Sequence, residues 1–303
     1  PRHHADDRPP HHDDHQADHD DVYVHDDDVD DIHDRAAHHR STRAVIGTVA
    51  GAWRYPVKSL QGETVDHLDF TESGAGGDRT WGILDRTSGK VLTGKRWGAL
   101  LTASAARGDD GSVHITLPGG DDLVAGEPAT DAALSDWLDR PVTLVGPGDS
   151  IAYELTMDPT DDASPVWDFA TPSGSLVDLA AVHLLTDASL AAAAALAPDS
   201  NWDVRRFRPS LLIALNPAGN GRGEHGEYPE DAWIGHTVTC GEAAFTPFMP
   251  TPRCAMTVRE QPGIPRDVTV SRALTTHHSN NLGVYAQVQT AGRVRVGEAV
   301  TLA

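Results

Sequence analysis

Two cysteines, Cys240 and Cys254, are the only thiols in this chain of 303 residues. Two thiols are too few for a disulfide framework or a four-cysteine zinc or iron–sulfur site. Cys254 stands in PFMPTPRCAMTV, where three prolines restrict the backbone and predict a loop of fixed shape. The guanidinium of the adjacent Arg253 favours the thiolate, the form that binds metal or acts as a nucleophile. Cys254 is therefore a candidate catalytic and metal-binding residue. The alternative is a buried inert cysteine, a description that fits Cys240 better.

Lysine is scarce, because it occurs only at positions 58, 90 and 95. Lys58 and Ser59 follow the segment WRYPV, in which Pro56 ends or borders a strand. Donors at a strand terminus can bind an anion, so this pair forms a candidate binding site. The alternative is a lysine in a solvated loop.

Arg205, Arg206 and Arg208 lie in VRRFRPSLLIAL, just before an apolar run that is typical of a buried strand. Strand alternation would point Arg206 and Arg208 to the same side. Two guanidiniums together suit a phosphate or another planar anion. The alternative is that they pair with carboxylates such as those of Asp199 or Asp203.

Acidic residues dominate the composition. The chain has 45 Asp and Glu against 24 Lys and Arg, a formal net charge of −21. This charge repels phosphate backbones and anionic lipid, so we expect neither a nucleic-acid nor a membrane partner. No stretch is long and apolar enough for a membrane helix, and the N-terminus lacks the order of a secretory signal. We therefore expect a cytoplasmic protein.

Residues 1–43 differ from the rest of the chain. They hold 13 Asp, 10 His and 5 Arg, a net charge of −8 that leaves −13 for the other 260 residues. Their few large apolar groups cannot offset the entropy of ordering, so we predict a disordered tail. Its imidazoles and carboxylates could hold divalent cations, but no regular spacing recurs. The first residue is Pro rather than Met, so a misassigned start or an artefact is the alternative.

The remaining pattern predicts a mostly β protein with a few helices. Residues 112–117 alternate as in a half-buried strand, and residues 85–89 suit a hairpin turn with Gly89 in a left-handed conformation. Helical patterns occupy residues 130–140 and the stretch from Thr186, a plausible N-cap, to Leu196. The glycine-rich stretch 219–227 and the polar stretch around His277 and His278 are interpreted as loops. Further strands are predicted at 211–215, 237–240, 284–288 and 294–302.

Several segments together resemble the MOSC-domain proteins with an N-terminal β-barrel domain, a group that includes the mitochondrial amidoxime-reducing component and its bacterial relatives. The resemblance implies an α+β fold: a disordered tail over 1–43, a β-barrel-like N-terminal domain over 44–145 and a MOSC β-barrel over 146–303. The segments that carry it are GAWRYPVKSLQGE, GGDRTWGILD, LLTDASL, RFRPSLLIAL, EDAWIGHTV, PTPRCAMTV and GVYAQVQTAGRVRVGEAVTL.

The resemblance implies a molybdenum cofactor, whose metal would take its protein sulfur ligand from Cys254. A soft thiolate suits a metal that is already bound by sulfur. The other positions that match the family's cofactor-contacting motifs are Lys58, Ser59, Arg79, Thr186, Asp187, Arg206, Arg208 and Arg253, and the sequence does not settle which of Arg206 and Arg208 faces the cofactor.

The implied activity is a reductase that removes oxygen from N-hydroxylated or related N-oxygenated small molecules. Its electrons are expected from a separate ferredoxin- or flavoprotein-type partner, since the chain has no cysteine-rich ferredoxin-like extension. It also has no pyridoxal-phosphate desulfurase domain of the kind found in cofactor sulfurases, so that cofactor is not expected. A second hypothesis is a sulfur-carrier or cofactor-presenting module that holds a persulfide on Cys254.

Overall fold

A computed structural model describes residues 44–148, 150–156, 164–216 and 226–303. The expectations for the tail 1–43 and for most of the stretch 219–227 lie outside these residues. The described residues contain many strands and three α-helices, so the predicted mostly β fold is confirmed. None of these helices is both long and apolar enough to cross a membrane.

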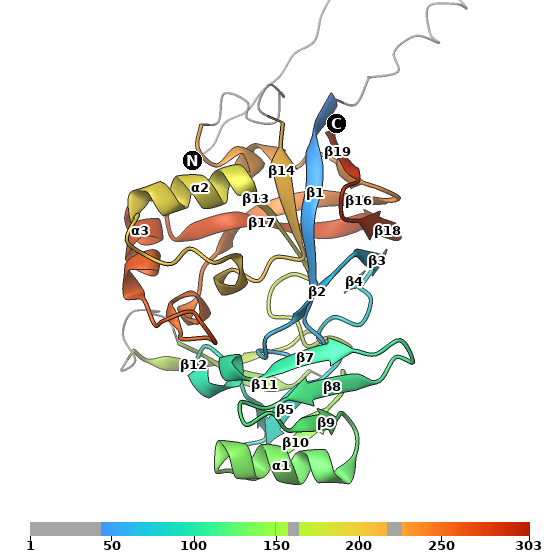
Figure 1. The fold of residues 1–303 in the computed structure, drawn as a ribbon, viewed down its shortest axis with the longest axis vertical. Coiled ribbons are helices and arrows are strands. Elements are labelled where there is room, and N and C mark those ends of the chain that lie inside the picture. The colour runs from blue at the N-terminus through green and yellow to red at the C-terminus, as the bar shows by residue number, and fades with distance from the viewer. Residues whose placement is uncertain (1–43, 149, 157–163, 217–225) are drawn as a thin grey trace, which may run out of the picture. The chain divides into compact units, whose positions relative to one another are not determined.

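Seven strands close into a barrel, seen in the upper half of Figure 1. In spatial order they are β14 (Leu211–Leu215), β13 (Val182–Thr186), β17 (Asn281–Thr290), β16 (Ala243–Pro252), β15 (Val238–Cys240), β19 (Ala299–Leu302) and β1 (Ala44–Arg54). The pairing of β1 with β14 completes the ring, and β2 (Glu63–Val65) extends the sheet beside β1.

Strand β1 closes the barrel because it pairs with both β19 and β14, and the register shifts once within each pairing. It pairs with β19 at its start and with β14 further along, and a shift lies near Gly47 and another between Val49 and Gly51. A Cβ atom at Gly47 would lie 2.2 Å from the carbonyl oxygen of Ala214. Only glycine permits this close approach of two strands. The strand ends at Arg54, and the chain continues directly into Tyr55 and the residues after it.

The other strands form three smaller sheets. A five-stranded sheet has the order β10 (Val142–Val145), β5 (Gly82–Asp85), β6 (Lys90–Val91), β11 (Ala152–Thr156), β12 (Val166–Ala170). A second sheet contains β7 (Ser104–Arg107), β8 (Val113–Thr116) and β9 (Asp122–Val124), and a third contains β18 (Gly292–Arg295), β3 (His67–Thr71) and β4 (Gly74–Ala75).

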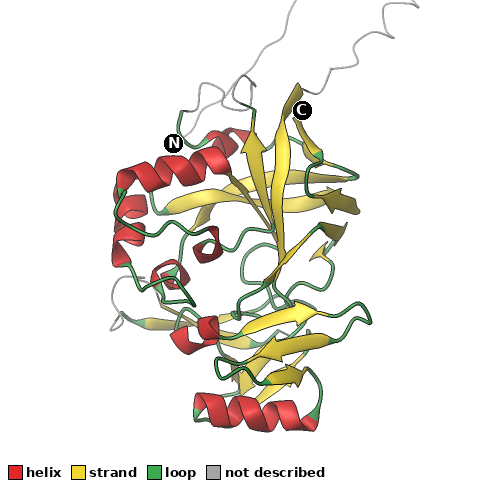
Figure 2. Ribbon diagram, in the orientation of Figure 1, coloured by secondary structure: helices red, strands yellow, loops and turns green. Residues whose placement is uncertain are grey.

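Figure 2 shows the helices against these sheets. The α-helices are α1 (Pro128–Leu138), α2 (Asp187–Leu196) and α3 (Val268–His278), and the short 3₁₀ helices include η1 (Gly98–Thr102), η2 (Val204–Arg206), η4 (Pro229–Trp233) and η5 (Ala255–Val258).

Several local predictions are confirmed. Residues 82–85 and 90–91 pair as a hairpin, with Gly89 at φ +70°. The hydroxyl of Thr186 accepts a hydrogen bond from the backbone N–H of Ser189 and so caps α2. Helix α1 buries Leu134 in the core of the smaller sheets.

Two loop predictions are wrong. The proline-rich segment before Cys254 forms strand β16, because its prolines lie where the register with β17 shifts. At such irregularities a missing backbone N–H removes little pairing. The pair His277 and His278 forms the last turn of α3, which begins where the side chain of Asp267 accepts a hydrogen bond from the N–H of Thr269. This cap outweighs the low helix propensity of the segment.

Aromatic side chains fill the barrel. Phe245 is fully buried, and its ring packs edge-to-face on Phe70 with 4.8 Å between centroids. Trp233 is also fully buried in this core. A second core joins the five-stranded sheet, the β7–β9 sheet and α1 through Leu60, Ile83, Leu100, Ile115 and Leu134.

Replacing Phe245 by alanine should lower the free energy of unfolding by about 3–5 kcal/mol, because it leaves a cavity in the barrel. Phe248 is a matched control on the same strand, since 39% of its surface is exposed, and its alanine variant should cost under about 1 kcal/mol. Urea unfolding measures both. Equal losses would contradict this assignment of the core.

Candidate functional site

A cavity of about 80 Å³ lies beside Cys254. Its walls come from distant parts of the chain: the segment before β13, the residues after η2, the junction of β16 and η5, and strand β17. Positive side chains dominate the charged part of its lining, although the whole chain is acidic. The charged lining residues are Arg79, Lys95, Asp178, Arg206, Arg208 and Arg253.

Cys254 is the partly exposed thiol of this cavity. It directly precedes η5, and its backbone carbonyl accepts hydrogen bonds from the N–H and the hydroxyl of Thr257, at 3.1 and 2.9 Å. Its side chain does not cap η5. Cys240, by contrast, is fully buried in the barrel core, and burial raises the pKa of its thiol to about 12. The two cysteines therefore differ as expected in their exposure.

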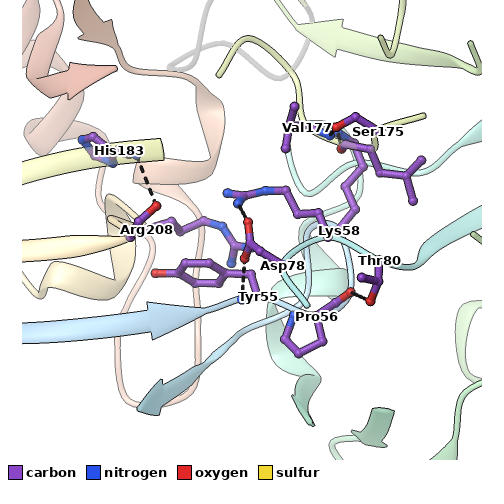
Figure 3. Close-up of polar contacts among 12 residues, drawn as sticks. Tyr55, Pro56, Lys58, Asp78, Thr80, Ser175, Val177, His183 and Arg208 are labelled. Atoms are coloured by element: carbon purple, nitrogen blue, oxygen red, sulfur yellow. Dashed lines mark hydrogen bonds and ion pairs between the residues drawn. The ribbon is translucent and has the colours of Figure 1, made fainter. Parts of the chain in front are cut away.

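The ring of Tyr55 contacts two arginines, and Figure 3 shows Tyr55 beside Asp78 and Arg208. The guanidinium of Arg208 lies 4.0 Å from the centroid of the Tyr55 ring, and that of Arg79 lies 5.3 Å from it. Asp78 pairs with Arg79 and accepts a hydrogen bond from the backbone N–H of Tyr55 at 2.7 Å. The Tyr55 hydroxyl donates to the carbonyl of Pro209. These contacts connect the end of β1 to the segment after η2.

Arg208 keeps its positive charge in the site. Its Nη1 donates to the carbonyl of Leu60 at 2.7 Å, and its backbone has φ +54°. Burial lowers the pKa of Arg208 to about 10, which still leaves the guanidinium protonated at neutral pH. Arg208 therefore presents a positive charge to the cavity.

Arg206 has a different role. It is fully buried, and all three of its guanidinium nitrogens donate to backbone carbonyls, those of Asn201, Thr257 and Pro265 among them. The expected strand alternation of Arg206 and Arg208 is wrong, because residues 204–206 form η2 and Arg208 is left-handed. Both side chains nevertheless line the cavity. The arrangement makes Arg206 a support for η5 and leaves Arg208 as the more available cation.

Arg253 also binds the walls together. Its guanidinium donates to the carbonyl of Phe207 at 2.7 Å and to that of Leu282 at 3.4 Å. Its Nε is buried and has no hydrogen-bond partner among the described residues. The ion pair predicted as an alternative for the arginine triplet is formed by Arg205, which pairs with Asp203.

Two lysines share one carboxylate at the edge of the site. Lys58 and Lys95 pair with the two oxygens of Asp178, and Lys58 also donates to the carbonyl of Leu176 at 2.7 Å. Both ammonium groups lie over the ring of Tyr153, at 4.9 and 5.3 Å from its centroid. Lys58 is only 4% exposed, so the alternative of a solvated loop lysine is wrong.

Burial and the ion pairs shift the pKa values of Asp178, Lys95 and Lys58 in opposite directions. Burial alone would raise the pKa of Asp178, but the two lysines lower it well below the ordinary range. Burial would lower the pKa of Lys95, yet Asp178 raises it above the ordinary value. Burial lowers the pKa of Lys58 in spite of the same carboxylate.

The structure does not bring four of the predicted positions into the lining of this cavity: Lys58, Ser59, Thr186 and Asp187. Thr186 caps α2 and donates to the buried carboxylate of Glu230 at 2.6 Å. Asp187 accepts a hydrogen bond from the backbone N–H of Leu215. Ser59 is buried beside Lys58 with φ +70°.

Sequence reasoning missed Lys95, Asp178, Tyr55 and Tyr285. Lys95 had a usable signal, because it is one of three lysines in an acidic chain. Tyr55 lies close in sequence to the Lys58 motif. Tyr285, which lines the cavity, stands in the segment GVYAQVQTAGRVRVGEAVTL, whereas Asp178 stands in none of the segments quoted above.

Comparison with known proteins agrees with this architecture. The family model "MOSC N-terminal beta barrel domain" matches residues 46–140, and "MOSC domain" matches residues 172–301. The chain belongs to the MOSC family. Among curated relatives, mitochondrial amidoxime reducing component 2 of Bos taurus is 25% identical over 292 residues, which cover 84% of this chain and 83% of that protein.

Solved structures of low sequence identity also match this chain. The YUAD protein from Bacillus subtilis is 11% identical and has a TM-score of 0.44, with 86% of this chain and 97% of that chain covered. YiiM from Geobacillus stearothermophilus is 13% identical and has a TM-score of 0.30, with 50% and 73% covered.

Stability should depend on pH through Asp178. Because its folded pKa lies below the ordinary value, its contribution to stability is fully present above about pH 5 and is lost as the pH falls toward the folded pKa. Asp178→Asn should therefore make the free energy of unfolding less dependent on pH between about pH 5 and pH 3. Urea unfolding across this range measures the effect.

Asp168→Asn is the matched control, because Asp168 also pairs with a lysine but its side chain is 60% exposed. Exposed pairs contribute little to stability, so this variant should keep the wild-type pH dependence. An Asp178→Asn curve parallel to that of the wild type would contradict the assignment.

Proposed function

We propose that this MOSC protein binds the molybdenum cofactor in the cavity beside Cys254 and acts as a molybdenum-dependent reductase of N-hydroxylated or related N-oxygenated small molecules. The observation that carries the proposal is the concentration of positive side chains around one partly exposed thiol in a chain of net charge −21. The similarity to an amidoxime reducing component supports the reaction class.

The thiol and the positive side chains of the cavity have the chemistry that this cofactor requires. A thiolate is a soft ligand that suits a molybdenum centre already bound by sulfur. The guanidiniums of Arg79, Arg208 and Arg253 suit its phosphate and the polar edge of its pterin. Among the described residues no group of three His, Cys, Asp or Glu side chains could hold a metal ion by itself, so a metal here would need ligands from a cofactor.

The volume of the cavity is a stricter test of cofactor binding than the chemistry of its lining. Pockets for ligands of cofactor size measure roughly 300–1,000 Å³, whereas the cavity beside Cys254 measures about 80 Å³. An adjoining pocket of about 210 Å³ shares Arg79 and Ala181 with it. Leu179, which lines the first cavity, is 62% exposed. Binding of the whole cofactor therefore requires the second pocket or a displacement of the segment around Leu179.

The bound cofactor would supply the two-electron oxygen-transfer chemistry, and the protein would bind and orient it. Cys254 would hold the metal, and Arg208 would neutralise negative charge nearby. Lys95 keeps its proton at neutral pH, because Asp178 raises its pKa, and it lines the cavity as a hydrogen-bond donor. His183 stays neutral, since burial lowers its pKa to about 3.

Electrons would come from a separate ferredoxin- or flavoprotein-type partner. The chain has two cysteines, and Cys240 is buried in the barrel core, so this chain cannot bind an iron–sulfur cluster through cysteines. The proposed substrate is a small molecule that reaches Cys254 through its partly exposed side of the cavity.

Cys254→Ala should abolish molybdenum retention and reductase activity. Cys240→Ala is the matched control and should retain the metal, although it weakens the barrel core. Both proteins are purified from a host that makes the cofactor, and their metal and pterin contents are measured. Full molybdenum occupancy in Cys254→Ala would refute the ligand role. A persulfide on Cys254 without bound metal would instead favour the sulfur-carrier function.

Arg208→Met should weaken cofactor retention about 10- to 100-fold, because hydrogen bonds to charged groups contribute about 1.5–3 kcal/mol. Arg205→Met is the control, since Arg205 is partly exposed, pairs with Asp203 and does not line the cavity beside Cys254. Loss of pterin during dialysis measures retention. Equal retention by the two variants would exclude Arg208 as a cofactor-binding residue.

A further inference from the structure

One residue, Asn280, binds both backbone polar groups of Arg253. The N–H of Arg253 donates to the carbonyl of Asn280 at 2.8 Å, and the side-chain Nδ2 of Asn280 donates to the carbonyl of Arg253 at 2.8 Å. The carbonyl of Arg253 and the nitrogen of Cys254 belong to the same planar peptide unit. The Asn280 amide therefore fixes the orientation of the peptide plane that leads to the Cα atom of Cys254.

The regular sheet does not fix this plane. The register between β16 and β17 shifts between Pro250 and Pro252, and pairing ends where Pro252 faces Asn281. Cys254 comes two residues later, before η5 begins. The two hydrogen bonds between Asn280 and Arg253 replace strand pairing at the position where a metal-binding thiol needs a defined direction.

Asparagine also suits the backbone at this position. Ser279 and Asn280 have φ +48° and +59°, so two successive residues are left-handed after α3. Asparagine adopts this conformation more readily than most residues. The N–H of Asn280 donates to the carbonyl of Leu274 at 2.9 Å, which attaches the turn to the end of α3.

His278 holds the turn from the other side. Its Nδ1 contacts the carbonyl of Asn281 at 2.8 Å, and its Nε2 contacts the carboxylate of Asp231 at 2.7 Å. Its ring stacks on Tyr228 with 3.6 Å between centroids. The support for Asn280 thus extends into η4 and the barrel.

We propose that Asn280 is a positioning residue that directs the Cys254 thiol into the cavity. This inference rests on the proposed function, because the direction of the thiol matters only if Cys254 binds a ligand there. Asn280 itself does not line the cavity, so it acts through the Arg253–Cys254 peptide unit.

The test is the alkylation rate of Cys254 by iodoacetamide in the full-length, cofactor-free protein, followed by peptide mass spectrometry. Asn280→Gly tolerates the left-handed backbone but removes the amide. Loss of one hydrogen bond of about 1 kcal/mol should make labelling about fivefold faster. Asn216→Gly is the control, because its amide also donates to a backbone carbonyl, that of Val45. This control should label at the wild-type rate.

A rate for folded Asn280→Gly less than threefold above that of the wild type would overturn the inference. A merely structural asparagine would lower the unfolding midpoint and leave the labelling of the folded protein unchanged. If Asn280→Gly does not fold, Asn280→Asp replaces it, since aspartate keeps the shape and the backbone preference. The measurement is then hydrogen–deuterium exchange over residues 253–258, which should be about fivefold faster; an unchanged rate would overturn the inference.

The two proposals fail separately. Labelling of the cofactor-free protein does not depend on molybdenum, so wild-type labelling by Asn280→Gly would remove the positioning role alone. Full molybdenum occupancy in Cys254→Ala would remove the proposed function, whatever the labelling rate of the Asn280 variant.

Discussion

Positive charge collected around one cavity is the feature on which the rest of this structure depends. A buried cation is costly unless an oxygen or an aromatic ring faces it. Here each positive charge has a specific partner: Asp178 pairs with Lys58 and Lys95, and Asp78 pairs with Arg79. Backbone carbonyl groups accept hydrogen bonds from Arg206 and Arg253, and the ring of Tyr55 faces the guanidinium of Arg208. The protein thus holds its cations in place before any ligand arrives.

The residues of the site come from both MOSC modules of the chain. Lys58, Arg79 and Lys95 lie in the region matched by the N-terminal beta barrel model, whereas Arg208 and Cys254 lie in the MOSC domain. Strand β1 connects the two, because it closes the MOSC barrel and then leads directly to Tyr55 and Lys58. The side chain of Arg259 adds a further connection by donating to the carbonyl of Lys95. Neither module alone contains the whole set.

Local signals in the sequence predicted local structure well. The cap at Thr186, the turn at Gly89 and the helix around Leu134 depend on residues close in sequence. The motif around Cys254 is recognisable in the sequence, but its prolines predict a loop, because the register shift that admits them is set by β17. Arg206 and Arg208 both line the cavity, although η2 replaces the strand whose alternation predicts this.

Long-range partners were beyond sequence reasoning. Asp178 acquires its role only because residues 58 and 95 come to either side of it, some 120 and 83 positions away. The positioning contact of Asn280 likewise depends on the way α3 ends against β16. Conversely, a sequence motif can suggest residues that the site does not use. Thr186 and Asp187 stand in such a motif, yet their side chains bind Glu230 and Leu215 instead of lining the cavity.

The central claim is that the sulfur of Cys254 binds a molybdenum centre already held by the sulfurs of its cofactor. X-ray absorption at the molybdenum edge counts these ligands directly, in wild-type protein and in Cys254→Ser, where the serine oxygen can take the place of the sulfur ligand that Cys254→Ala removes outright. The account predicts one more sulfur ligand in the wild type than in the variant. Equal sulfur counts in the two proteins would contradict it.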